Sequence, residues 1–335
     1  MTNQAPRFSL GNLLRRPETG SFLGLVFVVA FFSFFGGTNF ASATGAASWL
    51  NVAASIGIVA LPIGLLMIAG ELDISIGSLI PAGSMTVAIL SGHFGFPIAV
   101  GIAAALGVGA LVGLINGILV VRTAVPSFIV TLGTLFAVAG LVLGLSVILT
   151  GTTSVALKAG PEAKFFLGHF ISGIYQVLIF WWIGISVLFA FVLHYTRFGN
   201  WIFAMGGDKV SARNAGIPTD RLTILLFMIS GVCATFVGVA QAILYNSAQV
   251  SAGQSYIFNA IISVVVGGVL LTGGYGSVFG IVLGTLTFAV VNQGIYFTPF
   301  DANWASLIIG VMLLLAVLMN NTFRTLALSY ASKKK

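Results

Sequence analysis

Long apolar runs alternate with short polar breaks along almost the whole chain. A helix needs about 20 apolar residues to cross the hydrocarbon core of a bilayer, with a range of roughly 17–25. Runs that meet or approach this length predict about ten transmembrane helices, at residues 21–38, 50–69, 78–92, 97–121, 126–149, 174–195, 222–244, 257–272, 277–297 and 303–320. The pattern therefore predicts an all-α integral membrane protein whose helices cross the membrane about ten times.

Composition supports this fold class. Of the 335 residues, 58% are hydrophobic, only 6% are charged and 42 are glycine. A soluble domain is usually about 45–50% apolar and roughly 25% charged, whereas small residues let membrane helices pack closely. We expect membrane lipid around the chain. The net charge of +7 does not indicate nucleic acid, because the basic residues lie between apolar runs.

The distribution of basic residues predicts how the chain is oriented. With ten spans and a cytoplasmic N-terminus, the C-terminus is cytoplasmic too. Twelve of the fourteen basic residues then lie inside: Arg7, Arg15, Arg16, Arg122, Arg197, Lys209, Arg213, Arg221, Arg324, Lys333, Lys334 and Lys335. Only Lys158 and Lys164 lie outside, which agrees with the preference of positive residues for the cytoplasmic side. We expect a cytoplasmic segment at 1–20, one transmembrane domain over 21–320 and a basic cytoplasmic tail at 321–335.

The stretch "MIAGELDISIGS", Met67 to Ser78, interrupts the apolar pattern. Its polar positions, together with the glycine that ends them, are two residues apart, and they are Glu71, Asp73, Ser75 and Gly77. Residues at this spacing share one side of an extended segment but point to nearly opposite sides of a helix. Because Gly70 and Gly77 let the backbone leave the helix, we predict a broken helix near residues 70–78 with a polar side.

Three roles are open for the carboxylates of Glu71 and Asp73. They could support a buried helix break, contact a transported solute, or sit in a solvated turn at the membrane surface. A carboxylate inside a membrane costs about 2.5–3.5 kcal/mol on insertion scales, and such groups usually serve function. The alternation favours the helix break, since a simple turn does not need it.

Four stretches in order carry a family resemblance: Met67 to Ser78; "GLINGILVVRTAVPSFIVTLGTL", Gly113 to Leu135; "TRFGNWIFAMGGDKVSARNAGI", Thr196 to Ile217; and "AIISVVVGGVLLTGGYGSVFGIVLGTL", Ala260 to Leu286. Together they resemble the membrane permeases of bacterial ribose-type ATP-binding cassette (ABC) sugar importers. The resemblance covers nearly the whole chain and implies a location in the bacterial inner membrane.

The resemblance also implies the partners. Such permeases pair in the membrane with a second permease subunit, the same chain or a related one. A sugar-binding protein docks outside, and an ABC ATPase dimer docks inside. The sequence has no GxxxxGK[ST] phosphate loop, so we expect no cofactor in this chain and place ATP and magnesium on the partner ATPase. The chain is therefore expected to be a transport subunit and not an enzyme.

The cytoplasmic loop 196–221 is the candidate contact with the ATPase. Its "DKVSARNAGI" sequence predicts a short helix with Asp208 as N-cap and Gly216 as the stop. A short projecting helix suits a groove on a partner protein. By resemblance, the coupling element comprises Gly207, Asp208, Ala212, Arg213, Gly216 and Ile217. An ordinary positive-inside loop is the alternative interpretation.

Polar and aromatic residues within the spans are candidates for contact with the solute. Sugars are bound by amides, carboxylates and aromatic faces. The candidates for the substrate pathway are Asn51, Phe128, Asn246, Asn259 and Asn292. Each amide could instead join helix to helix, which contributes about 0.6 kcal/mol on average.

The sequence therefore predicts the permease subunit of an ATP-driven importer for a monosaccharide or similar polyol. The alternative is an ion-coupled secondary transporter in which Glu71 or Asp73 carries the proton. A passive channel is the third class. The sequence does not name the sugar or distinguish a homodimer from a heterodimer.

Overall fold

The computed structural model describes residues 17–123, 125–299 and 301–304, together with six further residues, Leu307, Gly310, Val311, Leu314, Leu315 and Leu318. The predicted span 303–320 lies largely outside the described residues. So do most of the expected N-terminal segment 1–20 and the whole expected tail 321–335.

Eight helices in the described part are long and apolar enough to cross a membrane. They are α2 (Pro17–Ala41), α3 (Ala43–Ile68), α4 (Ile76–Val87) with its π-helical continuation η1 (Ala88–His93), α5 (Ile98–Arg122), α6 (Ser127–Thr150), α8 (Leu178–Tyr195), α11 (Thr219–Tyr245) and α13 (Val278–Gly294) with the 3-10 turn η3 (Ile295–Phe297). Each one coincides with a predicted span. The prediction of an all-α membrane protein is confirmed.

The predicted span 257–272 has a different form in the structure. Its helix, α12 (Gln254–Val266), has only 13 residues and is about 20 Å long. The chain then leaves the helix in a glycine-rich loop at 267–277, where Gly268, Gly273, Gly274 and Gly276 have positive φ. Hydropathy does not detect this ending, because residues 267–272 at the start of the loop are as apolar as the helix before them.

The remaining elements are short. They are β1 (Ser154–Ala156), α7 (Pro161–Ala163), η2 (Lys164–Gly168), β2 (Phe170–Ile171), β3 (Tyr175–Gln176), α9 (Arg197–Gly207), α10 (Lys209–Asn214), β4 (Ser247–Gln249) and η4 (Ala302–Trp304). β1 pairs antiparallel with β4, and β2 pairs antiparallel with β3.

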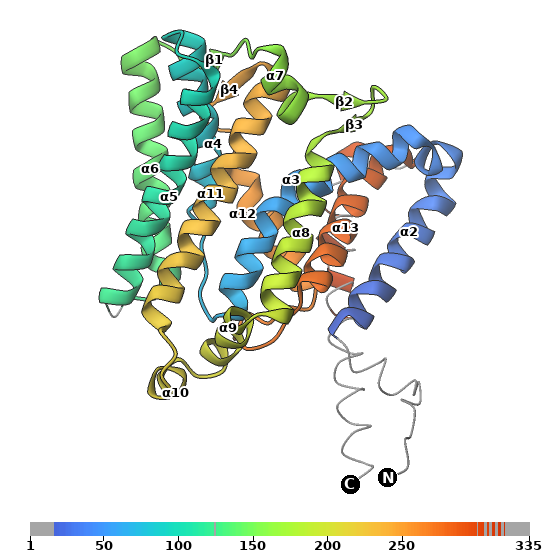
Figure 1. Ribbon diagram of the computed structural model, residues 1–335. Coiled ribbons are helices and arrows are strands. Elements are labelled where there is room, and N and C mark those ends of the chain that lie inside the picture. The colour runs from blue at the N-terminus through green and yellow to red at the C-terminus, as the bar shows by residue number, and fades with distance from the viewer. Residues whose placement is uncertain are drawn as a thin grey trace.

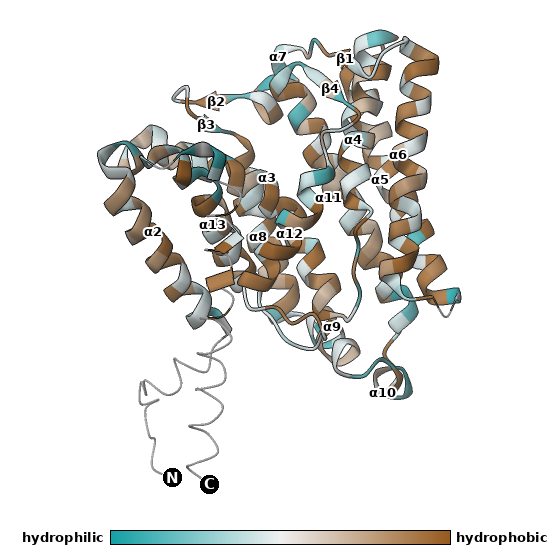
Figure 2. Ribbon diagram, turned by 180° about the vertical axis from the view of Figure 1, so that it is seen from behind, coloured by the Kyte–Doolittle hydropathy of each residue, from teal (hydrophilic) through white to brown (hydrophobic). Residues whose placement is uncertain are grey.

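These short elements separate to opposite ends of the helix bundle (Figure 1). The strands lie at one end, which we call the strand end. α9 and α10 lie at the other, which we call the α10 end. Figure 2 shows mainly apolar ribbon along the lengths of the helices and polar ribbon gathered at α10 and near the strands. This is the pattern expected of a bundle with lipid around its sides and water at its ends.

Helix α3 forms the centre of the bundle and α6 its outside. In the most apolar window of α3, 89% of the residues are buried, against 11% in α6. α11 packs against α5, α4 and α3, while α13 packs against α2, α3 and α12. The exposed faces of α2, α5, α6 and α8 are rich in Phe, Leu, Ile and Val, as a surface in contact with lipid requires.

Glycine allows α5 and α11 to pack at close range. Gly109 of α5 and Gly231 of α11 face each other, and a Cβ on either would collide with the carbonyl oxygen of the other. Gly113 likewise lies against the backbone of Phe227 and Met228. Close backbone packing of this kind is a main source of helix association in lipid.

Helices α4 and α12 are both preceded by non-helical chain, and their N-terminal turns meet inside the bundle. A Cβ on Gly253, the N-cap of α12, would collide with the carbonyl oxygen of Gly77 in α4. From this meeting point α4 and η1 run toward β1, since Gly92 lies against Ala156. α12 runs the other way, because Val266 accepts a hydrogen bond of 2.9 Å from Ser21, near the start of α2. The predicted broken helix is thus confirmed between α3 and α4, and α12 is a second short helix that starts within the bundle.

Candidate functional site

The segment between α3 and α4, residues 69–75, is the α3–α4 linker. The break starts at Gly70, whose φ of +84° favours glycine because a Cβ is strained in this region. Residues 71–74 have no helical structure, as the sequence predicts. The linker crosses the interior of the bundle, so its polar groups must find partners in protein.

The side chains of alternate linker residues reach three different helices. Glu71 Oε1 lies 2.5 Å from Lys209 Nζ, at the start of α10. Asp73 Oδ2 accepts a hydrogen bond of 2.8 Å from Ser230 Oγ on α11. Ser75 Oγ accepts one of 2.9 Å from Asn116 Nδ2 on α5. The polar positions that the sequence spaces two apart therefore each join the linker to a separate helix.

The backbone of the linker is held by a fourth helix. The N–H of Leu72 donates to Ser127 Oγ at 3.1 Å, and the N–H of Ile74 donates to Thr131 Oγ1 at 3.3 Å. Both acceptors lie in the first two turns of α6. These bonds replace the ladder that a helix or sheet would supply, which keeps the extended backbone hydrogen-bonded away from water.

Asp73 is the most deeply placed charged residue of the linker. Its side chain has no solvent exposure, and Ser230 is the twelfth residue of the 27-residue α11, so the carboxylate lies level with the middle of that helix. Besides the bond from Ser230, Oδ1 accepts bonds from Ser75 N at 2.9 Å and Ser75 Oγ at 2.6 Å. Among the described residues Asp73 forms no ion pair. Three hydrogen bonds therefore replace the water that this group loses on burial.

Glu71 occupies a different environment. Its side chain is only 10% exposed and forms an ion pair with Lys209, whose side chain is 35% exposed. The pair lies at the α10 end and spans 138 positions of the sequence. Glu71 and Asp73 thus have separate roles, because one joins the linker to α10 and the other joins it to the middle of the bundle.

A glycine contact lies directly beside this ion pair. Gly206, near the end of α9, is packed so tightly that a Cβ there would collide with the carbonyl oxygen of Ile68, the last residue of α3. That same oxygen accepts a hydrogen bond of 2.8 Å from Gly274 N. We call these three residues, with Gly70 and Gly273, the glycine junction. It brings the ends of α3 and α9 and the 267–277 loop together at backbone distance.

Helix α10 begins and ends as predicted. Asp208 Oδ1 accepts a hydrogen bond of 2.5 Å from Ser211 N, which is the geometry of an N-cap. This bond is the main reason that the pKa of the Asp208 carboxyl is lowered from its ordinary value of 3.8. Gly216 has a φ of +86° and ends the element, and its N–H bonds Arg213 O at 3.0 Å.

The six predicted coupling residues fall into two groups. Gly207, Asp208, Arg213 and Gly216 are exposed, whereas Ala212 is buried and Ile217 is half-buried. The Arg213 guanidinium pairs with Asp220 in the first turn of α11 and donates from Nε to Thr219 Oγ1 at 3.2 Å. The buried members hold α10 against the bundle, and the exposed ones are available to a partner.

The structure does not gather the five candidate pathway residues into one site. Asn51 is bonded to the β2–β3 hairpin, through Ile174 O at 2.9 Å and Gln176 N at 2.8 Å. Asn246 has a φ of +53° and caps the C-terminus of α11 at the strand end. The side chain of Asn51 and the backbone of Asn246 therefore both serve the fold.

The other three candidates are distributed over three helices. Phe128 lies at the start of α6 and is 49% exposed. Asn259 is half-buried on α12. Asn292, on α13, accepts a hydrogen bond of 2.8 Å from its neighbour Gln293. A side-chain pair that the sequence does not predict joins α11 to α12, through Gln241 Nε2 and the hydroxyl of Tyr256.

Several residues that build the linker site were not predicted from sequence. In the sequence, Lys209 is one more basic residue of a loop, and Ser230 is one more small residue of an apolar helix. A serine within an apolar run indicates a hydrogen-bond partner, but does not say which. Asn116, which reads as a helix-packing residue, does lie buried between helices, and its Oδ1 has no hydrogen-bond partner among the described residues.

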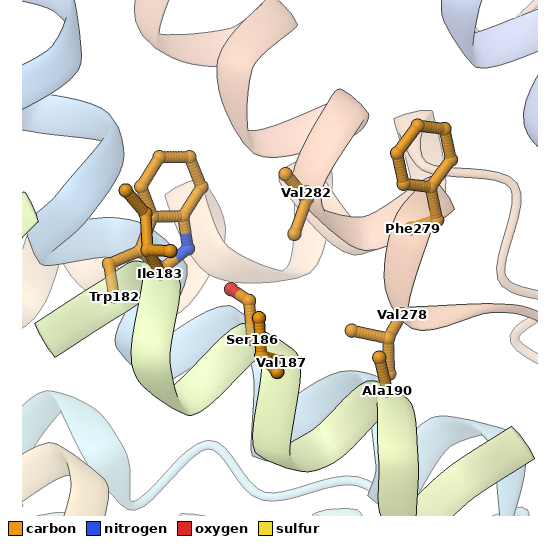
Figure 3. Close-up of a pocket in the computed structure, with 8 residues that line it drawn as sticks. All are labelled: Trp182, Ile183, Ser186, Val187, Ala190, Val278, Phe279 and Val282. Atoms are coloured by element: carbon orange, nitrogen blue, oxygen red, sulfur yellow. The ribbon is translucent and has the colours of Figure 1, made fainter. Parts of the chain in front are cut away.

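A groove of about 240 Å³ lies between α8 and α13 (Figure 3). Its lining is apolar except for Ser186 and the indole nitrogen of Trp182, neither of which has a hydrogen-bond partner in the described part of the chain. Ile183, Val187 and Phe279 along it are 51%, 64% and 59% exposed, so the groove is on the outer surface of the bundle. A hydroxyl-rich solute would find too few polar partners there.

The described part of the chain offers no candidate metal site. The described residues contain no group of three or more His, Cys, Asp or Glu side chains that could hold an ion. Cys233 is buried in α11. The fold and the linker site together define a multi-pass helical membrane protein with an extended linker inside the bundle between two of its spans, and a short helix at one end.

Comparison with known proteins identifies the family. Residues 45–317 match the family described as branched-chain amino acid transport system / permease component, and the chain belongs to this permease family. It is similar to the ribose import permease protein of Escherichia coli K12, at 32% identity over 79% of this chain and 81% of that protein. It is also similar to the fructose import permease protein of Rhizobium meliloti, at 30% identity over 90% and 84%.

A third relative is a probable ABC transporter permease protein of Escherichia coli K12, at 33% identity over 89% of each chain. All three matches cover most of both proteins. The chain is accordingly a permease of the ribose-type import family. The alternative of an ion-coupled transporter is not favoured by these relatives.

Proposed function

We propose that this chain is the membrane subunit of an ATP-driven importer that moves a monosaccharide or similar polyol across the bacterial inner membrane. The observation that carries the proposal is the similarity, over about four fifths or more of the chain, to permeases named for ribose and fructose import. The absence of a GxxxxGK[ST] phosphate loop from the sequence supports an ATPase on a separate chain. A sugar-binding protein delivers the solute from outside.

The α10 end faces the cytoplasm in this proposal. Arg122 ends α5 and Arg197 begins α9, both at the α10 end. Lys209 and Arg213 lie in α10, and Arg221 lies in the first turn of α11. Lys158 and Lys164 lie between β1 and β2, at the strand end. Basic residues favour the cytoplasmic side, so both termini are cytoplasmic if the chain crosses ten times.

Helix α10 is the proposed contact with the ATPase dimer. It is short and capped, and Val210 on it is 69% exposed although apolar. Asp208 and Arg213 place charges on either side of that residue, and Gly207 and Gly216 border the helix. An exposed apolar side chain on a rigid helix suits the helix-in-groove mode of recognition, with Ala212 and Ile217 packed behind it.

Glu71, Asp73, Ser75 and Gly77 support the helix break in this proposal. They hold α4 in place, and in this proposal none of them contacts the solute. For the pathway we retain Phe128, Asn259 and Asn292, which have exposed or half-buried side chains on α6, α12 and α13. Asn51 and Asn246 border it at the outer end. A second permease subunit, the same chain or a related one, completes the pathway.

Reconstituted transport tests the proposal. The permease is purified from its native host with its associated ATPase and binding protein, placed in liposomes, and assayed with radiolabelled D-ribose and D-fructose. We expect uptake of a sugar that requires ATP on the ATPase side and the binding protein on the other, and that continues when the proton gradient is collapsed. Uptake by the permease alone, or uptake that follows the proton gradient, would overturn it.

A further inference from the structure

The ion pair between Lys209 and Glu71 has an unusual position for a residue of a docking helix. Lys209 is the first residue of α10, and its ammonium group lies 2.5 Å from the carboxylate of Glu71 in the linker, while its side chain stays 35% exposed. Arg213, the other basic residue of this helix, pairs with Asp220 only seven positions away. Lys209 therefore connects α10 to a distant part of the chain, while Arg213 connects it to the next helix.

Glu71, the partner of Lys209, belongs to the α3–α4 linker, which is hydrogen-bonded to several helices. Glu71 is followed by Leu72 and Ile74, whose N–H groups bond α6, and by Asp73 and Ser75, whose side chains bond α11 and α5. A displacement of Glu71 changes the geometry of these bonds, because the linker residues are consecutive and extended. The linker is thus the place where a movement at the α10 end reaches three membrane helices.

Direct backbone packing makes the same connection stiff. At the glycine junction, Gly206 of α9 lies against the last carbonyl of α3, without a side chain between them. Ile68 O is in turn bonded by Gly274 N. If α9 and α10 move as a unit, the end of α3 and the start of the linker must move with them. Backbone atoms in van der Waals contact are close-packed and transmit a displacement.

We propose that the Lys209–Glu71 ion pair transmits movement of α10 to the α3–α4 linker, and that both residues are positioning residues for coupling of ATP hydrolysis to transport. Neither residue then contacts the ATPase or the solute. The inference rests on the proposed function of α10 as the ATPase contact. It adds the route by which that contact acts on the membrane helices.

Charge reversal tests the route in the purified assembly. The variants are Lys209→Glu, Glu71→Lys and the double exchange of the two charges, each co-purified with the ATPase and binding protein. The measured quantity is the amount of D-ribose or D-fructose taken up per ATP hydrolysed. Each single reversal places two like charges together, and we expect this ratio to fall at least about fivefold, within the usual range of coupling between sites. In the double exchange we expect it to return to within about twofold of the unaltered chain.

Three further measurements keep the outcome specific. Glu71→Gln and Lys209→Gln each remove one charge without creating repulsion. They keep the test informative if the charge reversals prevent folding, and we expect a smaller fall in the same ratio. Arg122→Glu reverses an exposed charge at the same end, outside the 196–221 loop, and serves as the matched control, with an expected ratio within about twofold of the unaltered chain. The amount of ATPase that co-purifies is expected to stay constant throughout.

The outcomes separate this inference from the proposal it rests on. If the single variants keep their ATPase but the double exchange is no better than either, the ion pair is not the route. If Lys209→Glu itself releases the ATPase, Lys209 is a docking residue and the inference is wrong. If changes across α10, including Val210→Asp, leave ATPase binding and uptake intact, the assignment of α10 as the contact fails instead.

Discussion

Ser230 Oγ donates a hydrogen bond of 2.8 Å to Asp73 Oδ2, although the two residues are 157 positions apart in the sequence. The bond joins the middle of α11 to an extended segment that crosses the bundle. Neither residue is exposed to solvent. A carboxylate at this depth is tolerated because hydrogen bonds surround it, and the surrounding bonds are the basis of the first two predictions.

Replacement of Ser230 by alanine should destabilise the fold. The substitution removes one of three hydrogen bonds to a fully buried carboxylate, and we expect the free energy of unfolding to fall by about 1–3 kcal/mol. Thermal unfolding of the detergent-solubilised chain measures it as a lower midpoint. Ser186→Ala is the matched control, because Ser186 Oγ has no hydrogen-bond partner among the described residues and its loss should leave the midpoint almost unchanged. Equal midpoints for the two variants would contradict the role of Ser230.

Asp73→Asn should retain ATP-driven uptake of sugar. Asparagine has the same shape, and its carbonyl oxygen can accept either the two Ser75 bonds or the Ser230 bond, so the helix break persists at some cost in stability. The amide cannot titrate, so full uptake in this variant would remove a proton carried by Asp73 from the mechanism. Loss of uptake in a correctly folded variant would return the ion-coupled alternative to consideration.

Gly206→Ala and Gly207→Ala should have opposite effects on stability. Within a helix, alanine is normally more stable than glycine by roughly 0.5–1 kcal/mol. At Gly206 the new Cβ collides with the carbonyl of Ile68, and overpacking of this kind costs about 1–3 kcal/mol. At Gly207 the same Cβ meets no atom within 4 Å. Unfolding midpoints of the two variants, measured side by side, should therefore fall for the first and not for the second.

Gly216→Val should uncouple ATP hydrolysis from transport while the protein still inserts in the membrane. The φ of +86° at this position is strained for any β-branched residue, so the end of α10 must change shape. Gly160→Val, at the N-cap of α7 with negative φ and open space around its Cβ, is the control. Uptake and ATP hydrolysis measured on the same liposomes give the result, and normal uptake in Gly216→Val would count against coupling through α10.

The N-terminal cap of α10 should weaken in acid. The pKa of the Asp208 carboxyl is lowered in the folded chain from its ordinary value of 3.8. The capping bond therefore stabilises α10 at pH values above 3.8, and this stabilisation is lost as the pH falls through the lower pKa of the folded chain. A spin label at Val210 reports the order of the helix, and its mobility should stay constant from pH 7 to about 4 and rise below that. In Asp208→Asn the cap remains without a titrating group, so the same label should show no such step.

Local signals in the sequence predicted much of the fold. The eight long spans follow from apolar length alone, because lipid requires each crossing to satisfy its own backbone. Gly70 marked the broken helix, and Asp208 with Gly216 marked the two ends of α10. The predicted span 257–272 is the exception: its glycine-rich second half is apolar, so hydropathy alone did not separate the 13-residue α12 from its loop.

The sequence by itself determined most of the long helices, the break after α3 and the alternation of the polar residues that follow it, since these properties depend on near neighbours and on the solvent. Only the tertiary structure decided what those polar residues hold. It paired Glu71 with Lys209, Asp73 with Ser230 and Ser75 with Asn116, across 138, 157 and 41 positions. Each apolar helix can pack in lipid against many others at similar energy, so partners are chosen by the close fit of glycines and by buried polar groups, and both are settled only when the whole bundle is assembled.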